Sequence, residues 1–187
     1  MQIIESIRAE YLRYKALAEA SIDQLEDQHL AAAGPNGGLS IATICWHVSG
    51  NLRSRFTDFL TTDGEKPWRK RDEEFEARSV TRAELLAKWQ QGWEALLTTL
   101  ATLSDTQLGD TIAIRGEQLK VYEALHRSLA HTSYHVGQIV YLAKSFSGAK
   151  WKYLSIAPKG GEAYHRNLAS QSAAAHAAAL IEKDRLR

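Results

Sequence analysis

The chain has 187 residues, with 23 Lys and Arg against 22 Asp and Glu, so its formal net charge is +1. This balance argues against a dedicated nucleic-acid-binding protein, which carries a basic excess or stripe. The single cysteine, Cys45, excludes an internal disulfide and a zinc site built from several cysteines. The sequence shows no signal-peptide pattern and no apolar run near the ~20 residues of a membrane span. We therefore expect a cytoplasmic protein that does not enter the membrane.

The first part of the chain predicts two amphipathic helices. Apolar residues at steps of three and four predict a helix over about 3–29. The segment 34–38, which contains one proline and three glycines, ends this helix. Ser40 is a suitable N-cap for a second helix over about 41–60. Residues 61–79 carry charges of both signs in balance and predict a loop.

The second part predicts two further helices and a small hairpin. Thr81 and Glu84 have the spacing of a capping box, which predicts a third helix that extends to about residue 103. Segments 111–114 and 119–121 could pair as a hairpin. A fourth helix is predicted over about 120–144, followed by an irregular segment and an Ala-rich tail. These elements favour an all-α fold, an up-and-down four-helix bundle with irregular loops.

The fourth predicted helix contains the most informative polar pattern, the pair His131 and His135. Residues at i and i+4 differ by only about 40° around a helix, so both imidazoles lie on one face and could bind one metal ion. His126 points almost opposite and is excluded as a further ligand. The pair is not a zincin motif, because Thr132 stands where a zincin has its general-base Glu.

A third histidine, His47, lies on the shoulder of the second helix and could meet the pair in a crevice between the two helices. Three histidines that leave coordination positions open are typical of a catalytic metal site. Without that convergence, an H-x-x-x-H pair is more often an ordinary surface pattern. Three nearby residues are candidates to support the ligands or to face a substrate, although they are equally compatible with a wet helix face: Asn51, Ser128 and Gln138.

Two other groups of residues carry weaker signals. Cys45 lies about 200° from His47 around the second helix, which predicts a buried and inert thiol. Charges in the predicted loop could bind a charged substrate, although solvated loop charges are the commoner explanation: Asp63, Glu65, Arg69 and Arg71. No residue is identified as a catalytic acid or base.

Three stretches of the sequence carry a resemblance to a known family. They are Trp46-His47-Val48-Ser49-Gly50-Asn51, the run His131-Thr132-Ser133-Tyr134-His135-Val136-Gly137-Gln138-Ile139, and residues 55–68. The chain resembles the DinB/YfiT-like superfamily over about residues 1–168, and the stretch 55–68 looks like that of a DinB-like subfamily whose members are largely uncharacterised. The Ala-rich extension, 169–187, lies outside the resemblance.

The resemblance implies a four-helix bundle with one longer crossover, and a homodimer. It implies that His47, His131 and His135 hold a divalent metal ion such as nickel or zinc. Characterised relatives include transferases and isomerases that use low-molecular-weight thiols such as bacillithiol or mycothiol. We therefore expect a thiol-dependent S-transferase acting on a small molecule. The alternatives are a metal-dependent hydrolase and a non-catalytic bundle that binds a metal or a small ligand.

Overall fold

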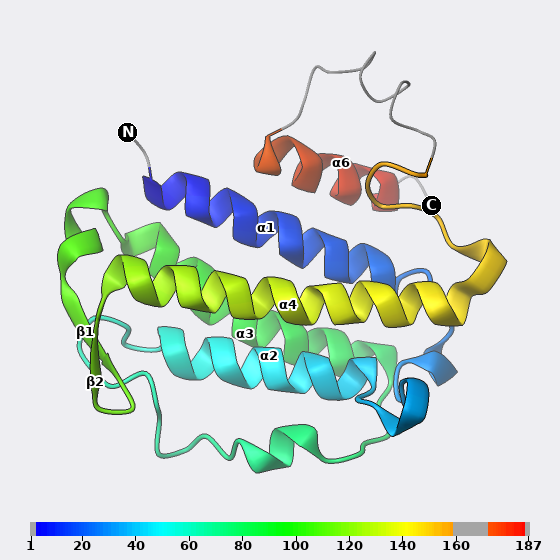
Figure 1. Cartoon of the computed structure of the whole chain (residues 1–187), viewed down its shortest axis with the longest axis horizontal. Helices are drawn as coiled ribbons and strands as arrows, with labels where there is room; N and C mark the ends of the chain where they lie inside the picture. The colour runs from blue at the N-terminus through cyan, green and yellow to red at the C-terminus, as the bar shows by residue number, and fades with distance from the viewer. Residues whose placement is uncertain (1–2, 159–171, 186–187) are drawn as a thin grey trace.

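Four long helices form the body of the structure, a computed structural model that describes residues 3–158 and 172–185 (Figure 1). They are α1 (Ile3–Ile22), α2 (Ile41–Phe56), α3 (Arg82–Thr102) and α4 (Val121–Ser147). A further helix, α6 (Ala173–Arg185), follows near the end of the chain. The prediction of an all-α bundle is confirmed.

The direction of the helices follows from the long connection over residues 57–81. Thr99 Oγ1, near the end of α3, donates a hydrogen bond to the carbonyl of Phe56 at 2.7 Å, and Ser49 Oγ donates to the carbonyl of Lys88 at 2.5 Å. α2 and α3 therefore run in the same direction, while α1 and α4 run in the other (Figure 1). The order is up, down, down, up, which corrects the strict alternation of an up-and-down bundle and agrees with one long crossover.

The helix starts agree with their sequence signals. Ser40 Oγ accepts a hydrogen bond from the Thr43 amide at 3.1 Å and caps α2. At the start of α3, Thr81 Oγ1 accepts from the Glu84 amide at 3.2 Å, and the Glu84 carboxylate accepts from the Thr81 amide at 2.8 Å. This reciprocal pair is the predicted capping box.

The first two helices end earlier than their apolar patterns predict. α1 stops at Ile22 rather than near residue 29, where a short 3₁₀ turn, Asp27–His29, follows instead. The guanidinium of Arg82, the first residue of α3, donates to the carbonyls of Ile22 at 3.0 Å and Leu25 at 2.6 Å. These hydrogen bonds provide partners for carbonyls that the end of α1 leaves unpaired. α2 stops at Phe56 rather than near residue 60, and Asp58 just beyond it has a left-handed φ of 49°.

The predicted hairpin is present as β1 (Thr111–Ile114) and β2 (Glu117–Lys120). Arg115 and Gly116 form its two-residue turn, with φ values of 57° and 77°, as a type I′ turn requires. The carboxylate of Asp63 accepts hydrogen bonds from both of their amides, at 2.8 and 2.7 Å. The turn is thereby fastened to the crossover near the end of α2.

Large aromatic side chains fill the centre of the bundle. Tyr11, Trp89 and Trp93 are fully buried, and Tyr11 meets Trp93 edge to face at 6.2 Å between ring centroids. Gly92 allows the closest approach of α3 to α2, because a Cβ at this position would lie 2.5 Å from Ser49 Cα. The two helices that run in parallel are therefore held in direct backbone contact.

The C-terminal helix α6 covers part of α1 (Figure 1). Ala177 and Leu180 are buried there against Ala16. The boundary that the sequence predicts between a bundle over 1–168 and an extension over 169–187 lies outside the described residues. No helix in the described ranges, 3–158 and 172–185, is both long and apolar enough to cross a membrane.

Candidate metal centre

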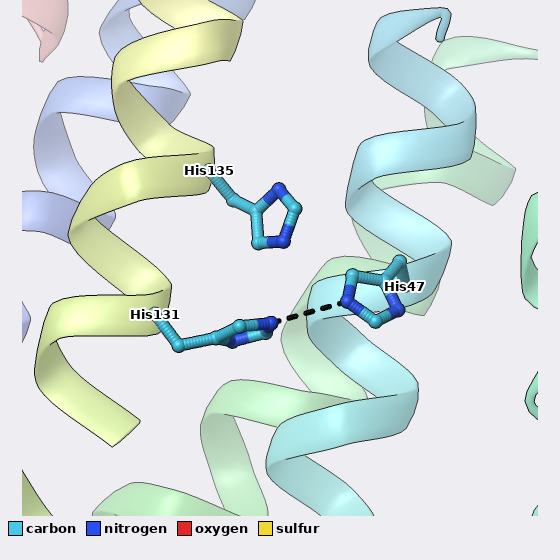
Figure 2. A group of neighbouring side chains, drawn as sticks. All are labelled: His47, His131 and His135. Carbon is cyan, nitrogen blue, oxygen red and sulfur yellow. Dashed lines mark hydrogen bonds between the residues drawn. The ribbon is translucent and has the colours of Figure 1, made fainter. Parts of the chain in front are cut away.

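Three histidines from two antiparallel helices come together in the middle of the bundle. His131 and His135 project from α4 toward His47 on α2 (Figure 2). His47 Nε2 lies 3.1 Å from His131 Nε2, and one ring nitrogen from each of the three residues lies within 4.8 Å of the other two. His47 and His135 are buried, and His131 is half-buried.

This arrangement fits the geometry of a metal site. Nitrogen ligands bind zinc at about 2.0–2.1 Å, so two ligands of one tetrahedral ion lie about 3.4 Å apart. The 3.1 Å separation of His47 and His131 is close to this value, and the nitrogen of His135 lies within 4.8 Å of the other two. The three histidines could therefore hold one metal ion.

The ring of His47 is oriented by a carboxylate that belongs to the crossover. His47 Nδ1 lies 2.9 Å from Oε2 of Glu74, a buried residue. The Arg69 guanidinium binds the same carboxylate through two nitrogens, each at 2.8 Å. With Nδ1 donating to Glu74, the Nε2 lone pair of His47 is directed toward the other two histidines, an arrangement typical of metal-binding histidines.

Glu74 is held in its ionised form. Burial raises the pKa of its carboxyl, but the hydrogen bonds from Arg69 and His47 outweigh burial and lower the pKa below its usual range. Gly50, one turn after His47 on α2, makes room for this carboxylate, because a Cβ at residue 50 would overlap the Glu74 side chain. The glycine and the glutamate are thus complementary.

His135 has its own orienting partner. Its Nδ1 lies 2.8 Å from Oε1 of Gln138, and Gln138 Nε2 donates to the Tyr134 hydroxyl at 3.2 Å. The contact leaves Nε2 of His135 available on the side of the other histidines. Burial is the main cause that lowers the pKa of His135, and the hydrogen bond with Gln138 opposes it.

His131 completes the group as a neutral imidazole. Burial, followed by the charges of His135 and His47, lowers its pKa to about 4. A histidine binds metal through the neutral ring, so the lowered pKa keeps His131 available as a ligand at neutral pH. Its Nδ1 is buried and makes no hydrogen bond within the described part of the chain.

A cavity of about 290 Å³ opens beside this group. His47 and His131 form part of its wall, together with Asn51 and Ser128, two of the residues that the sequence suggested as substrate-facing. Gln138, the third, does not line this cavity but contacts His135. The three-histidine group therefore borders a space large enough for a small molecule.

His126 and Cys45 lie outside the three-histidine group. His126 is exposed and stacks edge to face on Tyr122, apart from the three histidines. Cys45 is fully buried, and burial raises the pKa of its thiol, which favours the inert protonated form.

The sequence did not predict that Glu74 contacts His47, nor that Arg69 binds the Glu74 carboxylate. Both lie in a stretch of balanced charge, in which no periodicity distinguishes one acidic residue from its neighbours. The available signal was Gly50, a glycine inside a helix three residues after a candidate ligand. Glycine there costs about 1 kcal/mol relative to alanine, which indicates that another group approaches closely.

Comparison with known proteins identifies a family. Searches of curated proteins and of solved structures found no match. Residues 1–161 match a family described as "Protein of unknown function (DUF1572)". This match includes the whole three-histidine group and the crossover that carries Glu74. The chain therefore belongs to the DUF1572 family of proteins of unknown function.

Proposed function

We propose that the protein binds one divalent metal ion through His47, His131 and His135 and uses it to catalyse thiol-dependent S-transfer on a small molecule. The observation that carries the proposal is the convergence of three imidazole nitrogens within 4.8 Å of one another, beside a cavity. Two of the rings have partners that hold Nδ1 and leave Nε2 for the ion.

The chemistry of the ligands suits nickel or zinc. Imidazole is a good ligand for both ions, and three protein ligands leave coordination positions for a substrate. A divalent ion in this position would lower the pKa of a thiol that reaches those open positions and so supply a thiolate, the nucleophilic form. The cavity beside His47 and His131 gives a small molecule access to the same side.

The proton that the nucleophile releases would not pass to Glu74. Glu74 is bound to Arg69 and His47, so it is not free to take a proton from water. In S-transfer the thiol sulfur bonds to the electrophilic carbon, the leaving group departs with its bonding electrons, and the thiol proton passes to solvent. The resemblance to the DinB/YfiT-like superfamily supports the same reaction class.

One experiment distinguishes a thiol-dependent transferase, a hydrolase and a non-catalytic binding protein. Metal-loaded protein is incubated with a low-molecular-weight thiol and an alkylating electrophile, and separately with ester and amide substrates without thiol. We expect metal-dependent consumption of the thiol, lost on chelation and in His131→Ala. Ester or amide turnover without thiol would instead show a metal-dependent hydrolase. Bound metal with neither activity would show a non-catalytic metal-binding or ligand-binding bundle.

Two further expectations belong to this proposal. The resemblance that suggests the thiol chemistry also implies a homodimer, and the sequence favours a cytoplasmic location. Both stay predictions, which size measurement in solution and cell fractionation can test.

A further inference from the structure

The cavity beside the three histidines has an unusual distribution of charge. Arginines from four separate segments line it: Arg55 on α2, Arg69 and Arg71 in the crossover, Arg115 in the hairpin turn and Arg127 on α4. Among the described residues that line the cavity, the one acidic residue is Glu117. Five guanidinium groups therefore surround a space of about 290 Å³ with one carboxylate among them.

Two carboxylates just behind the wall pair with three of the five arginines. Glu74 is bound by Arg69 and also accepts from His47. Glu65 is shared by two arginines, since its Oε2 lies 3.2 Å from Arg55 and 2.7 Å from Arg115. Two carboxylates thus form ion pairs with three guanidinium groups. Burial lowers the pKa of Arg55, the contact with Glu65 opposes this effect, and the charges of Arg69 and Arg115 lower the pKa further.

The other two arginines are free to bind a ligand. The Arg71 guanidinium lies 3.6 Å from the carboxylate of Asp72, a fully exposed side chain, and stacks on the ring of Phe75 at 4.9 Å. An exposed pair of this kind contributes little. Arg127 makes no ion pair or hydrogen bond with any residue whose side chain the structure describes. It precedes His131 by one helical turn on α4, so both lie on the same face.

Apolar side chains also line the cavity. Phe56 and Phe59 line it, together with Ile114 of the hairpin and Ala124 of α4. A ligand that fits this cavity would have a negatively charged group and a small apolar body. Guanidinium groups bind carboxylates and phosphates in the same planar, two-pronged geometry.

We propose that this cavity binds a small organic anion, a molecule with a carboxylate or a phosphate group held by Arg71 and Arg127 and an apolar body that extends past Phe56 toward His47 and His131. This inference deepens the proposed function by naming the class of its substrate. Only the role of the anion as a substrate rests on the proposed function. The binding of the anion itself depends on the arginines and can be measured without metal.

The test measures anion binding by titration calorimetry at low salt, with protein freed of metal by chelation and dialysis. The probes are succinate, inorganic phosphate and succinamide, an uncharged analogue of succinate. The variants are Arg71→Gln, Arg127→Gln and their combination. The control is Arg8→Gln, which removes one positive charge from α1, outside the cavity.

We expect succinate or phosphate to bind and succinamide not to bind. The double variant should bind the anion at least about tenfold more weakly, since it loses two charge-assisted contacts, and Arg8→Gln should match the wild type. Tighter binding of succinate assigns a carboxylate ligand, and tighter binding of phosphate assigns a phosphorylated one. The inference is overturned if neither anion binds, if succinamide binds equally well, or if the double variant binds like the wild type.

This design separates the two proposals. A protein that binds the anion but holds no metal would support the anion site and contradict the proposed metal-dependent function. A protein that holds stoichiometric metal but fails to bind either anion would contradict the anion site alone.

Discussion

The carboxylate of Glu74 lies 2.9 Å from Nδ1 of His47 and links a histidine of α2 to the crossover that follows it. Arg69 completes the link by binding both oxygens of the same carboxylate, and its side chain is only 2% exposed. The crossover is therefore part of the site, because it fixes the ring orientation of one proposed ligand and brings Arg69 and Arg71 to the cavity wall.

The first prediction concerns this link. Glu74→Gln removes the charge that holds the His47 ring, so we expect metal affinity to fall by about 10–100-fold, the usual effect of losing a partner behind a ligand. Competition with a metal-sensitive dye measures the affinity. The control is Glu73→Gln, which changes an exposed neighbour paired with Lys70. Equal affinity of Glu74→Gln and the wild type would contradict the role of Glu74.

The second prediction uses two glycines inside helices. Gly50→Ala adds a methyl group where the Glu74 carboxylate lies, so metal affinity should fall although alanine favours the helix. Gly137→Ala is the matched control, because a Cβ on Gly137 meets no atom of another element within 4 Å in the described part of the chain. We expect this control to keep the wild-type affinity and to be more stable by up to about 1 kcal/mol. The measurements are dye competition and urea unfolding.

The third prediction concerns the contact between α2 and α3. Gly92→Ala would place a Cβ 2.5 Å from Ser49 Cα, and a backbone atom cannot move aside as a side chain can. We expect the free energy of unfolding to fall by about 1–3 kcal/mol, as for other overpacked interiors. Urea unfolding measures the change, again against Gly137→Ala. Unchanged stability would show that the two helices can separate without cost.

The fourth prediction concerns pH and the metal-free protein. His131 has a pKa of about 4 in the folded chain and about 6.5 when unfolded, so between these values the unfolded state binds the additional proton. The contribution of neutral His131 to the free energy of unfolding should therefore be complete above pH 6.5. It should decrease as the pH falls from 6.5 to about 4. His131→Asn removes this group, and its stability should depend less on pH over that range. Unfolding in urea at a series of pH values tests this, and identical slopes for the two proteins would contradict it.

The sequence was sufficient to predict the elements that depend on local signals. The capping box at Thr81, the cap at Ser40 and the hairpin that begins at Thr111 each depend on residues a few positions apart. The structure contains all three, although the second strand covers 117–120 rather than 119–121. Helical spacing predicted that His131 and His135 share one face of α4, and the structure places His47 beside them, as the resemblance to the DinB/YfiT-like superfamily implies.

The remaining features depend on contacts between distant residues. α1 ends at Ile22 because Arg82, sixty positions later, binds its terminal carbonyls. Glu74 reaches His47 because the crossover folds back along α2, and the arginines of the cavity come from four segments. A periodic pattern describes one element at a time, so it cannot show which charged residues of an irregular segment meet a helix face.

The most direct test of the account is the metal content of the purified protein, measured by elemental analysis of the wild type and four variants. We predict about one nickel or zinc ion per chain in the wild type and in His126→Ala. We also predict loss of the ion in His47→Ala, His131→Ala and His135→Ala, with helical content preserved by circular dichroism. A wild type that takes up no divalent ion, even when supplied with nickel or zinc, or folded histidine variants that retain it, would contradict the central claim.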